Sequence, residues 1–201
     1  MKKHLFLFLS LLSSCGLCQQ PNKDDAAAKA KEPQGKNVYV DEAPLPEGWP
    51  TPGPYDAVAE KKYPAYRAAY TSAAMDGLAF WTLFSHIKRN DIPMTAPVEK
   101  TMSADADMKM SAMGFLYQNE KVGTVGADGK KVEVKDVAAT RVLTYTWMGD
   151  DSDENVKTAR TAIDAELTKR GVTATQYRIM GYNGPQTPRN RKTWELQAVL
   201  P

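Results

Sequence analysis

Residues 139–171 read ATRVLTYTWMGDDSDENVKTARTAIDAELTKRG, and in them a strand pattern runs directly into a helix pattern. Leu143, Tyr145 and Trp147 alternate with threonines, which is the two-residue period of a strand with one apolar face. Ser152 is a candidate N-cap, acidic residues follow it in the first turn, and Gly171 suits the helix end. The apolar stripe of the predicted helix recurs at helical spacing: Val156, Ala159, Ile163 and Leu167.

The same order of elements occurs earlier in the chain. Residues 63–72 alternate Tyr66, Ala68 and Tyr70 on one face, and residues 76–90 keep a helical stripe of Phe80, Leu83, Phe84 and Ile87. Further strands are predicted at 108–118, 173–182 and 193–200, and residues 126–131 (GADGKK) are rich in turn formers. Because strand–helix–strand occurs twice, the sequence predicts a duplicated α+β unit. We expect these β-α-β units to form an antiparallel sheet or distorted β-barrel flanked by two helices.

Composition and charge bound the function. The chain has 201 residues, enough for one domain of ordinary size with or without a tail, and its 42% hydrophobic and 25% charged content is typical of a globular protein. The formal net charge is +2. Without Lys2 and Lys3, 24 basic residues oppose 24 acidic ones, so bulk charge gives no support to nucleic-acid binding.

The N-terminus has the pattern of a targeting segment. Lys2, Lys3 and His4 precede the apolar run LFLFLSLLSS, which is too short to span a bilayer as a helix. The run ends in LSSC followed by Gly16, which resembles the bacterial lipobox, in which the cysteine (here Cys15) is lipidated. This predicts a protein anchored by lipid at the bacterial cell envelope. The alternative is an ordinary secretory signal that is cut near Gly16 or Cys18, which would release a secreted protein.

The predicted organisation has three parts. Residues 1–15 are the signal peptide, residues 16–54 form a tether rich in proline, lysine and alanine, and residues 55–201 form the folded domain. Trp49 lies within the tether, and the sequence leaves open whether it docks on the domain. No cysteine follows Cys18, so the folded part has no disulfide, cysteine-based metal site or thiol nucleophile.

Three stretches together resemble the SOUL/haem-binding protein family. They are PGPYDAVAEKKYPAYR (52–67), AFWTLFSHIKRNDIPMTAPVEK (79–100) and MGYNGPQTPRNRKTWELQAV (180–199), and the resemblance extends over about residues 52–200. It implies a duplicated antiparallel barrel with two helices. It also implies binding of haem or a related tetrapyrrole in an apolar cleft, in some members without tight iron coordination. The fold is similar to that of gyrase-inhibitor-like small-molecule-binding domains, some of which are hydrolases.

One position departs from a histidine-ligating member of this family. Lys62 stands before Tyr63 where that member has its histidine, and a protonated lysine is a poor iron ligand. The folded part has a single histidine, His86, on the first predicted helix. The spacing places His86 away from the centre of the apolar stripe, and we expect an exposed or flank histidine there. An axial ligand at the edge of the cleft is the alternative.

The remaining candidates for haem binding are soft or cationic side chains. Met94 lies between Pro93 and Pro97, where a core role is less natural than for the other methionines, and Met can contact or ligate haem. Cationic groups can pair with the propionates of a tetrapyrrole. The cationic candidates are Arg89 at the end of the first predicted helix and Arg189 and Arg191 on the last connection. Tyr182, in the closing family-like stretch, completes the set.

The sequence contains no recognisable catalytic set. It has no phosphate loop and no G-x-S-x-G motif, and its acidic residues are expected on surface faces. The favoured interpretation is a non-enzymatic protein that sequesters or delivers tetrapyrroles. A hydrolase on the related fold is the alternative, favoured if a glutamate is buried at the floor of a cleft, and an interaction module without a ligand is a third possibility.

Overall fold

The computed structural model describes residues 38–72, 77–103, 105 and 107–201. The compact unit is Asn37–Pro201. The predicted signal peptide, its lipidation site Cys15 and the first part of the predicted tether lie outside the described residues. Among the helices of the described ranges, none has the length and apolar character needed to cross a membrane.

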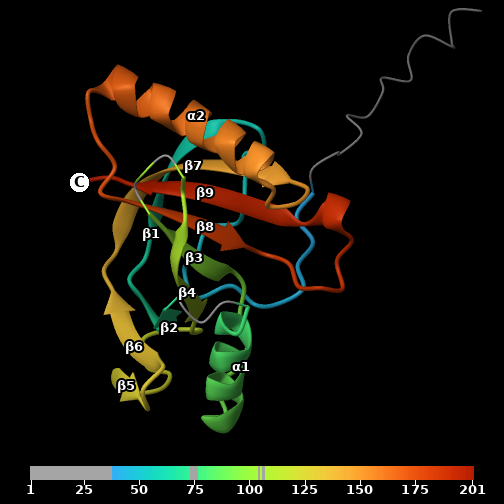
Figure 1. Cartoon of the computed structure of the whole chain (residues 1–201), viewed down its shortest axis with the longest axis vertical. Coiled ribbons are helices and arrows are strands. Elements are labelled where there is room, and N and C mark those ends of the chain that lie inside the picture. Colours follow the sequence, from blue (N-terminus) through green and yellow to red (C-terminus); the bar gives the residue numbers. More distant parts are fainter. Residues whose placement is uncertain (1–37, 73–76, 104, 106) are drawn as a thin grey trace, which may run out of the picture. The chain divides into compact units, whose positions relative to one another are not determined.

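The strands of the described residues form one antiparallel sheet in the order β1-β7-β9-β8-β3-β4-β2-β6-β5 (Figure 1). The first six strands are β1 (Val58–Tyr63), β2 (Tyr66–Ser72), β3 (Val98–Met102), β4 (Met110–Leu116), β5 (Gly126–Asp128) and β6 (Val132–Val137). The last three are β7 (Thr140–Met148), β8 (Gln176–Gly181) and β9 (Thr193–Val199). The helices are α1 (Ala79–Arg89) and α2 (Asp153–Arg170), and a 3₁₀ helix, η3 (Arg189–Arg191), precedes β9.

The sheet order confirms the predicted duplication. The units β2-α1-β3 and β7-α2-β8 have the same order of elements. In the duplication, β1, β2, β3 and β4 correspond to β6, β7, β8 and β9. With β5 left out, exchanging each strand for its counterpart gives the same sheet order read from the opposite edge. The α+β class is therefore correct. The expected barrel is not formed, because β1 and β5 are both edge strands and the sheet stays open and strongly curled (Figure 1). The short β5 extends one edge beyond the duplicated unit, and closure would require the two edges to pair.

Local sequence explains the second helix. Ser152 is its N-cap residue, although the cap makes no side-chain hydrogen bond, and Gly171 ends the helix in the left-handed conformation with φ of 65°. Its buried residues are those of the predicted stripe, Ala159, Ile163 and Leu167. In the first helix, Leu83 and Ile87 are buried.

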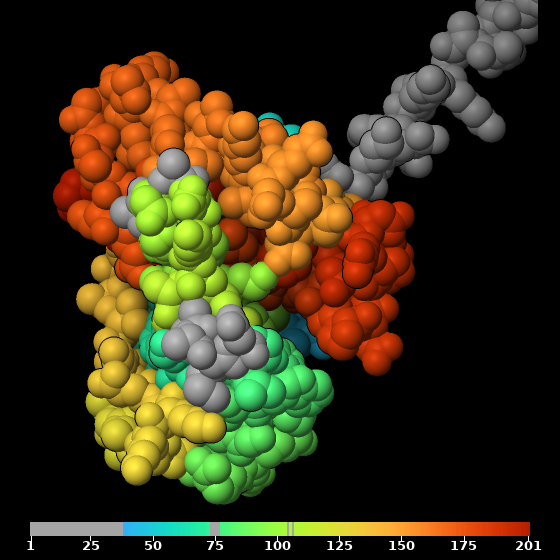
Figure 2. All heavy atoms as spheres, in the orientation of Figure 1, coloured from blue at the N-terminus to red at the C-terminus, as the bar shows by residue number. Residues whose placement is uncertain are grey.

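The two helices cover one face of the sheet, which we call the helix face; in Figure 2, α2 (orange) and α1 (green) are both visible on the side turned to the viewer. Under α2 the core contains Leu143, Trp147, Ile179 and Leu196, and under α1 it contains Ala69, Phe115 and Val134. Because alternate residues of a strand point to opposite faces, the residues between these positions form the other face.

The other face is covered by residues 38–54, which we call the arm, and is named the arm face. The arm has no helix or strand, yet Pro46 and Trp49 are buried in it. Trp49, left undecided by the sequence, docks in a core cluster with Tyr63, Tyr66 and Tyr182. The packed part of the chain therefore includes residues that the sequence places in the tether.

Candidate functional sites

The arm face buries charged side chains. Glu99 on β3, Arg178 on β8 and Glu195 on β9 are 2%, 2% and 0% exposed. The expectation that acidic residues lie on surface faces is wrong for these two glutamates. Buried charges are rare in proteins unless they are paired and hydrogen-bonded, so this face is the first place to look for chemistry.

The strand register explains why these residues meet. Glu99 is the direct cross-strand neighbour of Met180 on β8, and Met180 is the neighbour of Glu195 on β9. On the next strand Thr146 lies opposite Glu195. Residues directly opposite one another point to the same face, so the row places both carboxylates under the arm.

Glu195 is held by a full set of donors. Its Oε1 accepts hydrogen bonds from Tyr63 Oη at 2.5 Å and from Gln197 Nε2 at 2.6 Å. Its Oε2 accepts from Lys61 Nζ at 2.6 Å and from Thr146 Oγ1 at 3.0 Å. The Lys61 side chain is only 11% exposed, so the ion pair is shielded from water.

A second chain of hydrogen bonds links Glu99 to Gln197. Glu99 Oε2 accepts from Tyr66 Oη at 2.8 Å and from Tyr70 Oη at 3.1 Å. Tyr66 Oη in turn accepts from Arg178 Nη1 at 2.7 Å, and Arg178 Nε donates to Gln197 Oε1 at 2.6 Å. Arg178 Nη2 is buried and has no hydrogen-bond partner among the described residues. The two networks therefore meet at Gln197 and leave one guanidinium donor unused.

Burial controls the ionisation of the tyrosines on this face. It raises the pKa of Tyr63, Tyr66, Tyr70 and Tyr182 well above the usual value of 10.0. The neighbouring carboxylate of Glu195 raises the pKa of Tyr63 and Tyr182 further. These phenols therefore stay protonated and act as hydrogen-bond donors. We call the whole set the arm-face cluster: Lys61, Tyr63, Tyr66, Tyr70, Glu99, Arg178, Tyr182, Glu195 and Gln197.

Trp49 closes the arm-face cluster. Its ring lies edge-on to Tyr63 and Tyr66, with centroid distances of 4.6 and 5.2 Å. Its Nε1 donates to Tyr182 Oη at 3.3 Å, and the side chain is 6% exposed. The chain itself thus covers most of the cluster, while Lys61 and Tyr70 remain partly exposed.

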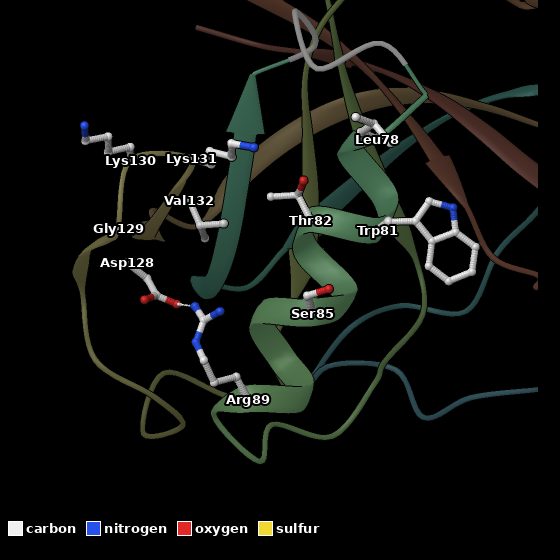
Figure 3. Close-up of a pocket in the computed structure, with 10 residues that line it drawn as sticks. All are labelled: Leu78, Trp81, Thr82, Ser85, Arg89, Asp128, Gly129, Lys130, Lys131 and Val132. Carbon is white, nitrogen blue, oxygen red and sulfur yellow. Dashed lines mark hydrogen bonds and ion pairs between the residues drawn. The ribbon is translucent and has the colours of Figure 1, made fainter.

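An open groove lies on the opposite side of the sheet, between α1 and the β5–β6 turn, and we call it the helix groove (Figure 3). Its volume is about 660 Å³. Figure 3 shows Arg89 reaching from α1 to Asp128, while Lys130 and Lys131 stand on the hairpin side. Leu78 lies at the upper end of α1, and the indole of Trp81 points away from the hairpin and forms the outer rim. These two apolar side chains are 57% and 61% exposed.

Arg89 is the sequence-predicted candidate that lines this groove. Its Nη2 is 2.5 Å from Asp128 Oδ2. Hydrogen bonds from His86, and then from Arg89 and Asn90, hold the pKa of Asp128 below its ordinary value of 3.8. Asp128 therefore stays ionised and ties the end of α1 to β5. We missed Lys130, Lys131 and Asp128 because a GADGKK turn reads only as a solvated loop.

His86 is 3% exposed, so the expectation of an exposed side chain is wrong. The side chain is buried because Tyr117, the residue after β4, has its Oη 2.7 Å from His86 Nε2, and because Asp128 contacts Nδ1. Both ring nitrogens are thus engaged within the protein. This arrangement leaves neither nitrogen free to ligate iron in this conformation.

The other candidates are dispersed. Met94 is partly buried and packs against the core beneath α1, so the prediction that a core role is less natural there is wrong. The prolines that bound its loop do not keep the side chain away from the core. Tyr182 belongs to the arm-face cluster, and Arg189 and Arg191 are exposed on η3. The structure therefore does not bring the predicted set together in one cleft. Within the described ranges there is no group of three or more His, Cys, Asp or Glu residues placed to hold a metal ion.

Comparisons with known proteins agree with the architecture. The family model described as SOUL heme-binding protein matches residues 54–195. No curated protein matches the chain.

Two solved structures have similar folds. The EcmrR C-terminal domain has a TM-score of 0.53 and 13% sequence identity, covering 72% of this chain and 96% of that one. A hydrolase from Listeria innocua has a TM-score of 0.53 and 12% identity, covering 74% of this chain and 94% of that one. At these identities the likeness shows the fold and assigns no function.

Proposed function

Since this chain belongs to the SOUL heme-binding protein family, we propose that it binds a tetrapyrrole such as haem in the helix groove, without catalysing a reaction on it. The observation that supports the proposal is that one groove has exposed apolar side chains at the start and outer rim of its α1 side and two lysines on its hairpin side. Leu78 and Trp81 offer a surface for a flat ring, and Lys130 and Lys131 offer partners for carboxylates. Tetrapyrroles carry both features.

The energetic logic favours ring contacts and ion pairs. Covering two large exposed apolar side chains contributes roughly 25 cal/mol per Å² of area removed from water. Charge-assisted hydrogen bonds from Lys130, Lys131 and Arg89 to propionates fix the orientation of the ring. Because His86 is engaged on both ring nitrogens, we propose that binding occurs without tight coordination of the iron by this histidine.

Titration of the full chain with hemin tests this proposal. We expect a saturable shift of the Soret band, weakened about tenfold by the double substitution Lys130→Ala and Lys131→Ala. The matched control replaces Lys157 and Lys169, two exposed lysines of α2, with alanine and should bind as the wild type does. An unchanged hemin spectrum would remove the proposal, and equal weakening by both pairs would show that general charge is responsible. His86→Ala should leave the position of the Soret band unchanged.

We also propose that the domain is held at the cell envelope by a lipid on Cys15. The LSSC sequence and the polar tether that follows it support this location. Metabolic labelling with a radioactive fatty acid should label the wild type, and Cys15→Ser should abolish the label. A wild-type protein that takes up no label would instead support a secreted form.

Hydrolysis of a small molecule is the second candidate function, because Glu195 is a buried glutamate and a solved structure with a similar fold is described as a hydrolase. Its four hydrogen bonds and the cover provided by Trp49 keep it from acting as a general base while the arm is closed. Turnover of ester substrates that is lost in Glu195→Gln, but kept in Glu60→Gln, would support this function over simple binding.

A further inference from the structure

The arm is attached by single, widely spaced contacts. At its start, Asn183 Nδ2 donates to Val40 O at 2.7 Å and Gly184 N donates to Glu42 Oε2 at 2.7 Å. Further along, single backbone hydrogen bonds tie it to the segments next to β3 and β4: Ala96 N to Pro44 O at 3.0 Å and Glu47 N to Gln118 O at 2.8 Å. Near its end, Lys61 Nζ donates to Thr51 O at 3.3 Å and Gly53 N donates to Thr146 Oγ1 at 3.2 Å. No ladder of regular hydrogen bonds holds residues 38–54, so the arm can leave without breaking a strand of the sheet.

Trp49 occupies the centre of the arm face much as a bound aromatic molecule would. The bicyclic ring is flanked by Tyr63 and Tyr66, and its one polar atom is matched to Tyr182 Oη. Aromatic walls with one or a few placed polar groups are the usual construction of a small-molecule site. The arm thus shows which shape the face accepts.

The arm face buries more charged groups than the packing of the arm against the sheet requires. Two carboxylates, one guanidinium and one ammonium group are buried there, although buried ion pairs are weak contributors to stability compared with apolar packing. Their formal charges balance, so the face favours a partner without net charge. Arg178 is 2% exposed, and its Nη2 is buried and lacks a partner among the described residues. A buried donor without a partner gains from any acceptor that is brought to it.

We propose that the arm face is a binding site for an uncharged, indole-sized aromatic molecule, and that Trp49 fills this site until a ligand displaces the arm. The ligand needs a donor that can reach Tyr182 Oη, as the indole nitrogen does, and gains from an acceptor that can reach Arg178 Nη2. This site lies on the opposite face of the sheet from the helix groove, and its occupancy does not depend on tetrapyrrole binding. Because the arm competes with the ligand for the same site, the stability of the docked arm would set the apparent affinity for the ligand.

The test uses the full chain labelled with fluorotryptophan, with indole as the probe. Fluorine resonances report the four tryptophans separately, and the Trp49 resonance is identified by its loss in Trp49→Phe. In the wild type we expect indole to move the Trp49 resonance to the position of a solvated ring, while the Trp147 resonance, from the helix-face core, stays in place. If saturating indole leaves the Trp49 resonance unchanged, the arm is a fixed part of the fold and the proposal is overturned.

Loosening the arm should increase the affinity for indole. Glu42→Ala removes the contact with Gly184 N, is exposed and touches no member of the cluster, so it should fold normally and lower the apparent Kd several-fold. Glu47→Ala, an exposed arm residue that keeps its backbone hydrogen bond, is the matched control and should leave the Kd unchanged. Equal Kd values for wild type, Glu42→Ala and Glu47→Ala would contradict competition by the arm.

A second probe, naphthalene, distinguishes a binding site with a specific polar partner from a cavity that binds any apolar molecule. Trp49→Ala should bind indole at least tenfold more tightly than the wild type. Naphthalene has the same shape without a donor, and this variant should prefer indole to naphthalene because Tyr182 Oη is there to accept. Tyr182→Phe in the same background should remove the preference. If naphthalene and indole bind Trp49→Ala equally well, the variant merely has a cavity and the ligand class proposed here is wrong.

Discussion

Glu99 and Glu195 flank the same residue, Met180, from the two strands that neighbour β8. They lie 96 positions apart in the sequence, but in the sheet only β8 separates their two strands. Both side chains are buried. Glu99 accepts hydrogen bonds from two tyrosine hydroxyl groups and Glu195 from one. This relationship leads directly to predictions for stability.

Removing the charge of Glu195 should destabilise the protein strongly. Glu195→Gln leaves the shielded Lys61 ammonium unpaired and sets a second amide donor among groups that donate. We expect a loss of about 3–5 kcal/mol in the free energy of unfolding, measured with urea. Glu60→Gln is the control, because Glu60 pairs with Arg170 at the surface, where water screens the ion pair, and its loss should cost much less than that of Glu195. Equal losses for the two variants would mean that Glu195 is not a buried ion-pair partner.

Alkaline titration should find tyrosines that do not ionise in the folded protein. Burial raises the pKa of Tyr63, Tyr66, Tyr70 and Tyr182, so above the ordinary value of 10.0 the unfolded chain has lost protons that the folded chain keeps. Their contribution to stability is complete below pH 10 and falls as the pH rises further. Tyrosinate absorbance should show these four phenols ionising only together with the loss of native circular dichroism. Ionisation of every tyrosine near pH 10 in a folded protein would contradict this structure.

Asp128 should make stability depend on acidic pH. Its pKa is lowered by its hydrogen bond from His86 and by its contacts with Arg89 and Asn90. A lowered pKa in the folded state contributes stability above the ordinary value of 3.8, and that contribution is lost as the pH falls towards the lowered value. The difference in unfolding free energy between wild type and Asp128→Asn should therefore be constant above about pH 5. It should disappear below about pH 3. A difference that persists unchanged to the lowest pH would show that the carboxylate charge is irrelevant.

Gly114 should not tolerate a side chain. A Cβ placed there would lie 2.6 Å from Cε1 of Tyr70, and Tyr70 cannot retreat easily because its hydroxyl group is bonded to Glu99. We expect Gly114→Ala to cost about 1–3 kcal/mol, as overpacking of a core does. Ser111→Ala, at an exposed position of the same strand, should change stability by less than about 0.5 kcal/mol. Thermal unfolding of the two variants under the same conditions measures the difference.

Much of the fold follows from local periodicity. The α2 stripe and Gly171 define that helix, and the alternation of Trp194, Leu196 and Ala198 defines the last strand. These signals are readable because each depends on residues within a few turns or a few positions. That the sheet stays open was not predictable in this way, and the expected barrel was wrong. Closure depends on whether β1 and β5 meet, and that depends on sheet curvature summed over all the strands.

The candidate sites were less accessible to sequence reasoning. Within β9 alone, Glu195 alternates with apolar neighbours, which is also the pattern of a strand with one solvated face. His86 likewise has the spacing of a flank residue on α1 until Tyr117 and Asp128 are placed beside it. In both cases the decisive partner comes from a distant part of the chain.

The sequence by itself determined the elements, their duplicated order and the family resemblance, because these depend on short-range patterns of apolar, capping and turn residues. Only the tertiary structure decided that the second face of the sheet is closed by the arm, with Trp49 over two buried glutamates. The physical reason is that a polar strand face looks the same in sequence whether it meets water or another segment. Burial is a property of what packs above it, and here that is a proline-rich segment with no periodicity of its own.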